Sequence, residues 1–575
     1  MNHLADLPGR NRCTTLKRCA LLAVAIGFPM GLSFPNAAAD EKPAPRVTRW
    51  DWTPEAANRP IGVARGINPG RVVWARDPEA TKWAGHWQEK ADQWWTDGNT
   101  DQTRVDAMLS ATLQKLASAP TDEAAWQAIF RYHNQTARQL ANHGYQPGEI
   151  VAVKINLNNS SAAKADNQTD ATPQMVLAMV RQLVEQAHVP PGRVVVYDVR
   201  RSIYGAMITK IWSAYPEVRF VQDGAPTADQ PRNPRSGDQR GIEAADWIEG
   251  ISYSQGSYHE AKLIPRQIRD ATYLVNLAIL KAHSYPYNYM EDGDEGQTAL
   301  SMCGKNHFGS IKGTWELHGA INTDAGGTPH AYSPIVDLAA SPNLGAKTVL
   351  YVLDGLYCGR KWRTYPLHFP NPPFNNRVEP YENPDWPASV LTSLDGVALD
   401  SVGLDILFSQ TKNNLDAVHG NVPRIMIREN ADDYLHEMAA ADHPPSGTAY
   451  RQDGRTVTSL GVFEHWDSDA SRRYSRNLDR EHGQGIELIF LPFADAPVAA
   501  PSVASAARAK ADTQTITLTC ATSGARIHFT TDGTVPTDRS PRYTAPLTVP
   551  IGAKINAVAV ADDRRDSAVV AGPGP

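Results

Sequence analysis

Cysteine is scarce in this sequence. Five cysteines occur in 575 residues, and two of them, Cys13 and Cys19, lie in an N-terminal segment that we expect to be removed. The other three, Cys303, Cys358 and Cys520, form no CxxC pair, so the chain has no ferredoxin-type ligand set for an iron–sulfur cluster. So sparse and odd a set is not a disulfide framework either. Two alternatives remain open, a bridge between Cys303 and Cys358 or unpaired buried thiols.

Several common catalytic signatures are also absent. The chain contains no GxxxxGK[ST] and no GxSxG, which disfavours ATP hydrolysis by a P-loop and α/β-hydrolase chemistry. Nor does it contain HxxxH or HxH, the short spacings that place two histidines on one metal ion.

An excess of positive charge is lacking. The formal net charge is −6, and residues 1–39 alone carry +3, so their removal leaves about −9. A nucleic-acid partner is therefore not expected.

The uncharged run from Cys19 to Phe34 follows four basic residues and precedes Ala37-Ala38-Ala39. This pattern predicts a signal peptide over 1–39, cleaved after Ala39, and a periplasmic or secreted protein. The run is short for a membrane span and contains Pro29, so no membrane span is expected after cleavage.

Length and periodicity indicate more than one folded unit. A helical stretch is expected at 103–143. The patterns then alternate between strands at 149–157, 193–199, 217–221, 273–280 and 348–354 and helices at 172–188, 202–215 and 400–410. This alternation predicts an α/β domain over 40–495, with a mostly parallel sheet and helices on both faces.

The composition changes near the C-terminus. Residues 496–511 are rich in Ala, Pro and Ser and are expected to form a linker. Short alternating strands at 515–518, 526–530 and 553–560 predict a small β-sandwich over 512–575.

The module contains the run IHFTTDGTVPT at 527–537, followed by YTAP at 543–546 and AVA at 557–559. These residues resemble the fibronectin III-like C-terminal domain of chitobiases and β-hexosaminidases. In that family the domain accompanies carbohydrate-active enzymes and is not their catalytic part. The resemblance therefore implies a polysaccharide or cell-envelope glycan as partner.

Seven separated pieces of residues 60–470 form a second pattern: 153–157 (VKINL), 196–198 (VYD), 280–283 (LKAH), 303–309 (CGKNHFG), His318, 352–355 (VLDG) and 395–400 (DGVALD). In this order they resemble a second family, the domain of unknown function 362. Some members of that family carry a ferredoxin segment, whose cysteines this chain lacks. No reaction is established for that family, so the resemblance implies none.

Polar side chains follow the apolar strands of the expected sheet, at the edge where open α/β folds bind ligands. Residues two apart on a strand share a face, so Lys281 and His283 can serve one site. The turn after Gly304 carries cationic and amide groups suited to an anionic or carbonyl oxygen. The candidate catalytic residues are Lys281, His283, Lys305, Asn306, Asp198 and Asp354. The candidate ligand-binding residues are Lys154, Asn156, His307, His318, Arg65 and Arg71.

Other interpretations of these residues remain open. A Lys and an Asp at strand ends can simply pair across neighbouring strands. Arg65 and Arg71 flank a Gly- and Pro-containing segment that can hold an anion or form a plain turn. A metal could use His283, His307, His318, Asp198 and Asp354. The Trp-rich region from Trp50 to Trp95 can bind sugar or pack as aromatic core.

Together these patterns favour an exported acid/base enzyme acting on a carbohydrate or another anionic, oxygen-rich compound. The alternatives are a non-catalytic glycan or cell-surface binding protein and a metal-dependent or redox protein.

Overall fold

The computed structural model describes residues 55–157, 160–164, 166–284, 298–318, 331–359, 365–369, 371–374, 386–410, 431–493, 496–510, 512–561 and 564–572. The described residues all belong to one compact unit, 47–575. The expected signal peptide lies outside the described residues.

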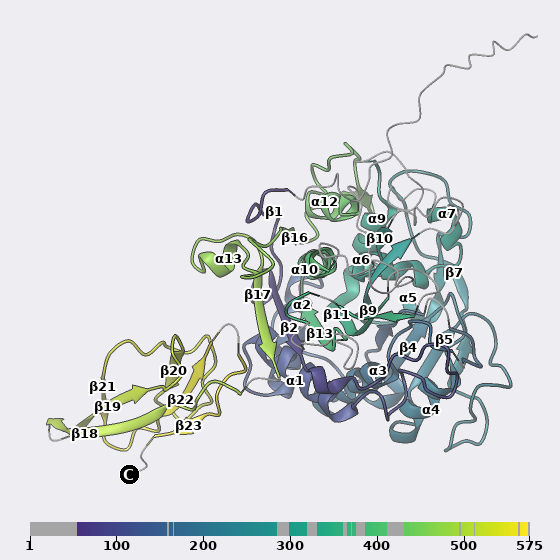
Figure 1. Ribbon diagram of the computed structural model, residues 1–575. Coiled ribbons are helices and arrows are strands. Elements are labelled where there is room, and N and C mark those ends of the chain that lie inside the picture. Colours follow the sequence, from purple (N-terminus) through teal and green to yellow (C-terminus); the bar gives the residue numbers. More distant parts are fainter. Residues whose placement is uncertain are drawn as a thin grey trace, which may run out of the picture. The chain divides into compact units, whose positions relative to one another are not determined.

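A mixed sheet of eleven strands, counted over the described residues, forms the centre of the large domain (Figure 1). The strand order is β17-β2-β13-β11-β9-β3-β4-β5-β6, with β10 paired to β9 and β12 to β11. The strands are β2 (Arg71–Arg76), β3 (Val151–Lys154), β4 (Val194–Asp198), β5 (Arg219–Gln222), β6 (Ile242–Ala244), β9 (Tyr273–Ser284), β10 (Thr298–Leu300), β11 (Thr348–Gly359), β12 (Pro366–Leu367), β13 (Ser389–Ser393) and β17 (Glu487–Pro492).

The expectation of a mostly parallel sheet is wrong, because the sheet is mixed. Neighbours from β11 through β9, β3, β4 and β5 to β6 run parallel. However, β13 runs antiparallel to both β11 and β2, and β10 and β12 are antiparallel too. A short, fully buried strand such as β13 has the same apolar pattern in either direction, so its sequence does not determine its orientation.

Helices cover both faces of the sheet, as the sequence predicts (Figure 1). Alternate strand residues enter opposite cores, because strand side chains have a period of two: Val151 and Val153 face one core, and Ala152 faces the other. The first core takes α1 (Gln102–Ala117), α2 (Asp122–Thr136), α3 (Pro173–Arg181) and α4 (Gly205–Ala214). The second takes α6 (Cys303–Asn306), α9 (Pro334–Ala340), α10 (Gly396–Ser409) and α12 (Asp433–Ala439).

The helical stretch expected at 103–143 is two helices. The Asp101 side chain caps α1 by accepting hydrogen bonds from the backbone N–H groups of Thr103 and Arg104. Ser118 ends it in the left-handed region, with φ 50°. Thr121 then caps α2 through the backbone N–H of Ala124. The first helix therefore ends at Ser118, although Gly is the residue typical of such a C-terminus.

Shorter elements complete the large domain. Among the described residues, the other α-helices are α5 (Arg266–Arg269), α7 (Thr314–His318) and α13 (Ser475–Leu478). Antiparallel ribbons pair β1 (Ile61–Gly62) with β16 (Val462–Phe463), β7 (Trp247–Glu249) with β8 (Leu263–Pro265), and β14 (Arg451–Gln452) with β15 (Arg455–Thr456). None of the described helices combines the length and the apolar character that crossing a membrane requires.

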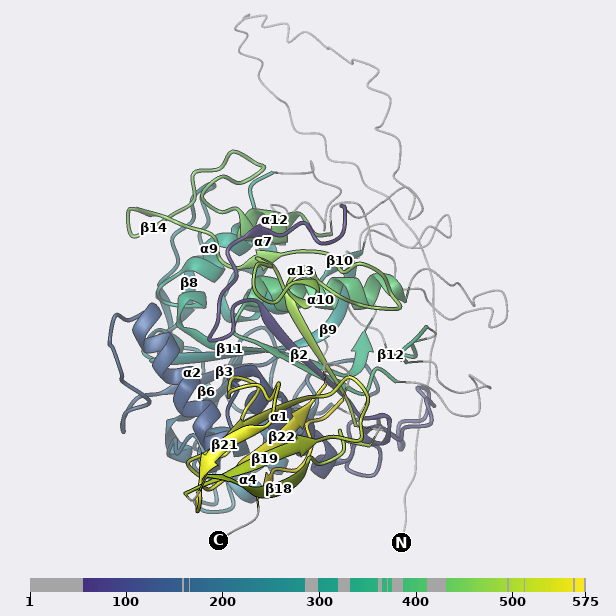
Figure 2. The same cartoon turned by 90° about the vertical axis from the view of Figure 1, so that its left-hand side faces the viewer.

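The C-terminal module contains two three-stranded antiparallel sheets. Their six strands are labelled in Figure 1, and Figure 2 shows the same module from another side. One consists of β18 (Ser502–Lys510), β19 (Thr513–Thr519) and β21 (Leu547–Pro550), the other of β20 (Arg526–Thr530), β22 (Asn556–Val560) and β23 (Val570–Ala571). Ile516 and Val549 from the first sheet share a core with Ile527 and Ala557 from the second. The segment expected as a linker, 496–511, contains β18, which pairs with β19.

Candidate functional site

A cavity of about 220 Å³ opens at the carboxyl ends of three parallel strands. Asn156 follows β3, Asp198 ends β4 and His283 lies near the end of β9. The loop and short helices that follow β10 supply the other wall, including Lys305, Asn306, Phe308, Trp315 and His318. The structure therefore gathers six of the predicted site residues around one space, at the sheet edge that the strand pattern indicates.

Below the cavity, Lys154 and Asp198 form a buried ion pair across the neighbouring strands β3 and β4. Lys154 Nζ lies 2.9 Å from Asp198 Oδ2 and 3.1 Å from Asn306 Oδ1, and the lysine is fully buried. Backbone N–H groups of Leu157 and Arg200 also donate to the Asp198 carboxylate. Burial lowers the Lys154 pKa, and the Asp198 carboxylate opposes that shift. This pair positions the strand ends and the Asn306 side chain.

Gly309 lies directly against this ion pair. A Cβ at this position would lie 2.6 Å from both Asp198 Oδ2 and Lys154 Nζ, so the close approach requires a residue without a side chain. The Gly309 carbonyl accepts a hydrogen bond from the backbone N–H of Val199. The CGKNHFG segment is thereby attached to the end of β4.

A buried chain of side chains continues from Asn306. Its amide donates to Asn276 Oδ1 at 2.8 Å, and the Asn276 amide nitrogen lies 3.4 Å from His307 Nε2. His307 Nδ1 lies 3.3 Å from Ser310 Oγ, which contacts Tyr197 OH. Burial lowers the pKa of His307 to about 3, so the imidazole is neutral near pH 7. His307 therefore belongs to the support of the cavity and not to its lining.

His283 lines the cavity as a neutral imidazole. Burial lowers its pKa well below the usual value, and the neighbouring charges of Lys305, Lys281 and His318 act in the same direction. Its side chain is 7% exposed, and its Nδ1 has no hydrogen-bond partner among the described residues. Asn156 Oδ1 is likewise buried without such a partner in the described part of the chain. Two polar atoms of the cavity wall thus have unused hydrogen-bonding capacity.

Sequence reasoning missed several lining residues. Arg200 and Arg201 follow Asp198 after one intervening residue, Val199, and Ser301 and Thr314 also border the cavity. Trp315 lines it with 67% of its side-chain surface exposed. The position of the arginines just after a strand end was a usable signal. A lone Trp in a polar loop offered none.

Besides Lys154 and His307, four predicted site residues do not line this cavity, and Lys281 and Asp354 are two of them. Lys281 is fully buried beside Gly359, although its charge acts on His283. The Asp354 carboxylate accepts hydrogen bonds from the backbone N–H groups of Thr172, just before α3, and of Leu356. Burial raises the Asp354 pKa to about 6. These contacts stabilise local structure.

Arg65 and Arg71 also lie elsewhere. The Arg65 backbone N–H donates to Asp395, and its guanidinium donates to the carbonyl of Ser459. Arg71 is buried and forms an ion pair with Glu487 at 2.7 Å between Nε and Oε2. The described contacts of Arg65 and Arg71 are thus made within the protein.

The metal set proposed from the sequence is not assembled. His283, His307, His318, Asp198 and Asp354 do not form a metal-binding group among the described residues. Cys303 and Cys358 are separate buried thiols, which decides between the two alternatives for that pair. Burial raises the pKa of both thiols.

The tryptophans that the structure describes in the N-terminal region are largely core residues. Trp74, Trp83 and Trp94 are almost fully buried, whereas Trp87 is 47% exposed. Trp50 and Trp52 lie outside the described residues. Aromatic packing, rather than sugar binding, accounts for the three buried rings.

Asp400 on α10 holds the helix that carries Lys305 and Asn306. Its carboxylate accepts hydrogen bonds from the backbone N–H groups of Cys303 and Gly304, at 2.9 and 2.8 Å, and from Tyr434 OH at 2.8 Å. These bonds occupy the first N–H groups of α6, which have no partners within the helix.

Asp400 also provides a pH-dependent test of folding. Burial raises its pKa from 3.8 to about 6, so the folded state retains a proton that the unfolded state releases between these values. The stability of the wild type relative to Asp400→Asn should therefore fall as pH rises from about 4 to 6, by up to about 1.4 kcal/mol per pH unit. Urea unfolding of both proteins at a series of pH values measures this difference, and parallel pH profiles would contradict it.

The fold and the cavity define an α/β protein with a mixed central sheet, a cationic site at the strand ends and a small C-terminal β domain. A family model described as the chitobiase/beta-hexosaminidase C-terminal domain matches residues 506–571. No curated protein matches the chain. The match confirms the resemblance of the C-terminal module. The resemblance of residues 60–470 to the domain of unknown function 362 stays a prediction.

Proposed function

We propose that this protein is an exported acid/base enzyme that acts on an acidic carbohydrate or a similar anionic, oxygen-rich compound in the strand-end cavity. One observation carries the proposal. His283 Nδ1 and Asn156 Oδ1 are buried in the wall of this cavity with no hydrogen-bond partner among the described residues. Buried polar atoms of this kind are normally satisfied, and a bound ligand would satisfy them.

The charge of the cavity indicates an anionic ligand. Lys305, Arg200 and Arg201 line it, while Asp198, the one carboxylate among the described lining residues, is paired with Lys154. An anion that binds here would offset the positive charges that depress the pKa of His283, and so make this imidazole a better proton acceptor. In this proposal His283 is the general base, and Lys305 and Asn306 stabilise negative charge on a substrate oxygen.

Two features favour an acidic carbohydrate over other anionic compounds. Trp315 presents an exposed ring at the cavity, where the C–H face of a sugar ring can pack against it. The C-terminal module belongs to a type that accompanies carbohydrate-active enzymes. A charged sugar, such as a uronate or a sugar phosphate, can pack against the Trp315 ring and pair with the cationic side chains of the cavity.

The test uses the full mature chain and a panel of glucuronate, glucose 6-phosphate and N-acetylglucosamine oligomers. We expect a charged sugar to raise the melting temperature of the wild type. Lys305→Ala should weaken its binding at least about tenfold, because a charge-assisted contact is lost. His283→Ala should abolish turnover of any saccharide that the wild type converts. His443→Ala, which removes an exposed histidine, is the matched control.

Two results would overturn the proposal. If no charged compound binds, or if both cavity variants bind and react like the wild type, the cavity is not the site. Binding of neutral oligosaccharides that Lys305→Ala and His283→Ala leave unchanged would instead support a non-catalytic glycan-binding protein.

A further inference from the structure

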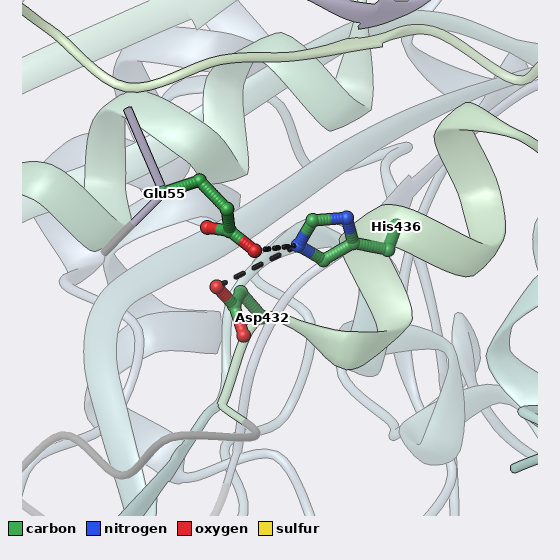
Figure 3. Close-up of side chains that lie close together, drawn as sticks. All are labelled: Glu55, Asp432 and His436. Carbon is green, nitrogen blue, oxygen red and sulfur yellow. Dashed lines mark ion pairs between the residues drawn. The ribbon is translucent and has the colours of Figure 1, made fainter. Parts of the chain in front are cut away.

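A second group of polar side chains lies away from this cavity, beside α12. Glu55, Asp432 and His436 each place one potential metal-ligand atom within 4.8 Å of the other two (Figure 3). His436 Nε2 lies 2.9 Å from Glu55 Oε1 and 3.8 Å from Asp432 Oδ2. Asp432 immediately precedes α12 and His436 lies four residues later, so the two share one face of the helix.

The short distances among these three groups are not aligned hydrogen bonds. Asp432 Oδ2 and His436 Nε2 are buried, and neither has a hydrogen-bond partner among the described residues, despite these short distances. Hydrogen-bonded pairs align a donor with an acceptor. Three potential ligand atoms that lie this close together without such alignment can instead coordinate one ion.

A neighbouring histidine strengthens this arrangement. His465 Nε2 lies 3.3 Å from the second oxygen of Glu55, and His465 Nδ1 lies 2.6 Å from Asp405 Oδ1. Asp405 is itself fixed by Tyr474 OH, 2.8 Å from Oδ2, and by the backbone N–H of Trp466. Carboxylates that hold ligands and their neighbours in place in this way are typical of metal sites.

The group is accessible from solvent. Glu55 and His465 also line a cavity of about 440 Å³, together with Asn58, Ile61 and Phe463. The pairing of β1 with β16 brings the two parts of this wall together. A metal ion could therefore enter on the Glu55 side and keep a coordination position open toward this cavity.

We propose that Glu55, Asp432 and His436 bind one divalent transition-metal ion, with Zn²⁺ as the reference ion. One imidazole and two carboxylates are the mixed nitrogen and oxygen donors that zinc accepts, and three protein ligands leave a fourth position free. The ion would connect the segment at Glu55 to the start of α12. This site shares no residue with the strand-end cavity, so it stands independently of the proposed carbohydrate chemistry.

Calorimetric titration of the EDTA-treated, full mature chain with Zn²⁺, Mn²⁺ and Ca²⁺ tests the site. We expect one Zn²⁺ per chain, Zn²⁺ binding more tightly than Ca²⁺, and a higher melting temperature with Zn²⁺. Glu55→Gln and Asp432→Asn keep the side-chain shapes and remove the charged ligands. Each should weaken Zn²⁺ binding at least about tenfold, as should His436→Ala.

His86→Ala is the matched control, because His86, Glu89 and Asp92 form the other such group among the described residues, and His86 and Glu89 are exposed. This variant should retain the wild-type Zn²⁺ affinity. The proposal is wrong if the wild type binds no Zn²⁺, or if Glu55→Gln and Asp432→Asn, folded by circular dichroism, bind it like the wild type. Loss of binding in His86→Ala alone would move the site to that exposed group.

Discussion

Replacing Lys154 by alanine is expected to lower the free energy of unfolding of the large domain by about 3–5 kcal/mol. The destabilisation comes from the Asp198 carboxylate, which remains without its partner. Asp198 is 2% exposed and would keep a buried negative charge after losing the ammonium 2.9 Å away. Backbone N–H groups of Leu157 and Arg200 still donate to this carboxylate, but they carry no full charge. The Asn306 amide oxygen would also lose its donor.

Urea unfolding at pH 7 measures this loss, and paired variants separate charge from packing. Lys154→Met keeps the length of the side chain and should be nearly as destabilising as Lys154→Ala. Combining Lys154→Met with Asp198→Asn removes both charges and should recover most of the loss, because a buried ion pair contributes little net stability over neutral partners. Equal destabilisation by the double variant and Lys154→Met would show that the buried charge is not the cause.

The sequence was sufficient to predict the strands β3, β4, β5, β9 and β11 of the main sheet, because buried strands and amphipathic helices have different periods. Expected strands at 149–157 and 193–199 correspond to β3 and β4, and the expected helix at 202–215 corresponds to α4. No strand was predicted at β13 (Ser389–Ser393), and its direction was not predictable either. That direction depends on which strands it pairs with, and β2 lies more than 300 residues away along the chain.

The candidate site was predictable to a similar extent. Strand ends placed Asn156, Asp198 and His283 at one edge, because parallel strands end on the same side of a sheet. The roles within that edge depend on pairing, which the sequence left open: Lys154 faces Asp198, not the cavity. The group of Glu55, Asp432 and His436 was not predicted from the sequence, for another reason. Glu55 and Asp432 are far apart in the sequence, and no local spacing connects them.

Replacing Trp74 by alanine should cost the large domain about 3–5 kcal/mol of stability, the range for removing a fully buried aromatic side chain. Trp74 is 0% exposed in β2, between β13 and β17. Its ring centroid lies 4.5 Å from that of Phe490 and 5.6 Å from that of Phe374, and its Nε1 donates to Ser389 Oγ at 2.9 Å. The variant loses both the packing and this hydrogen bond. The residues around β2 can fill only part of the space that the missing ring leaves.

Chemical denaturation of Trp74→Ala beside Trp87→Ala distinguishes core packing from ligand binding in this Trp-rich region. Trp87 is 47% exposed, so its removal should change stability by no more than about 0.5 kcal/mol. Trp74→Phe fills most of the same volume and should lose less than Trp74→Ala, although it still leaves Ser389 Oγ without the indole donor. If Trp74→Ala were as stable as Trp87→Ala but bound saccharides more weakly, the ring would serve a ligand, and the buried position in β2 would be wrong.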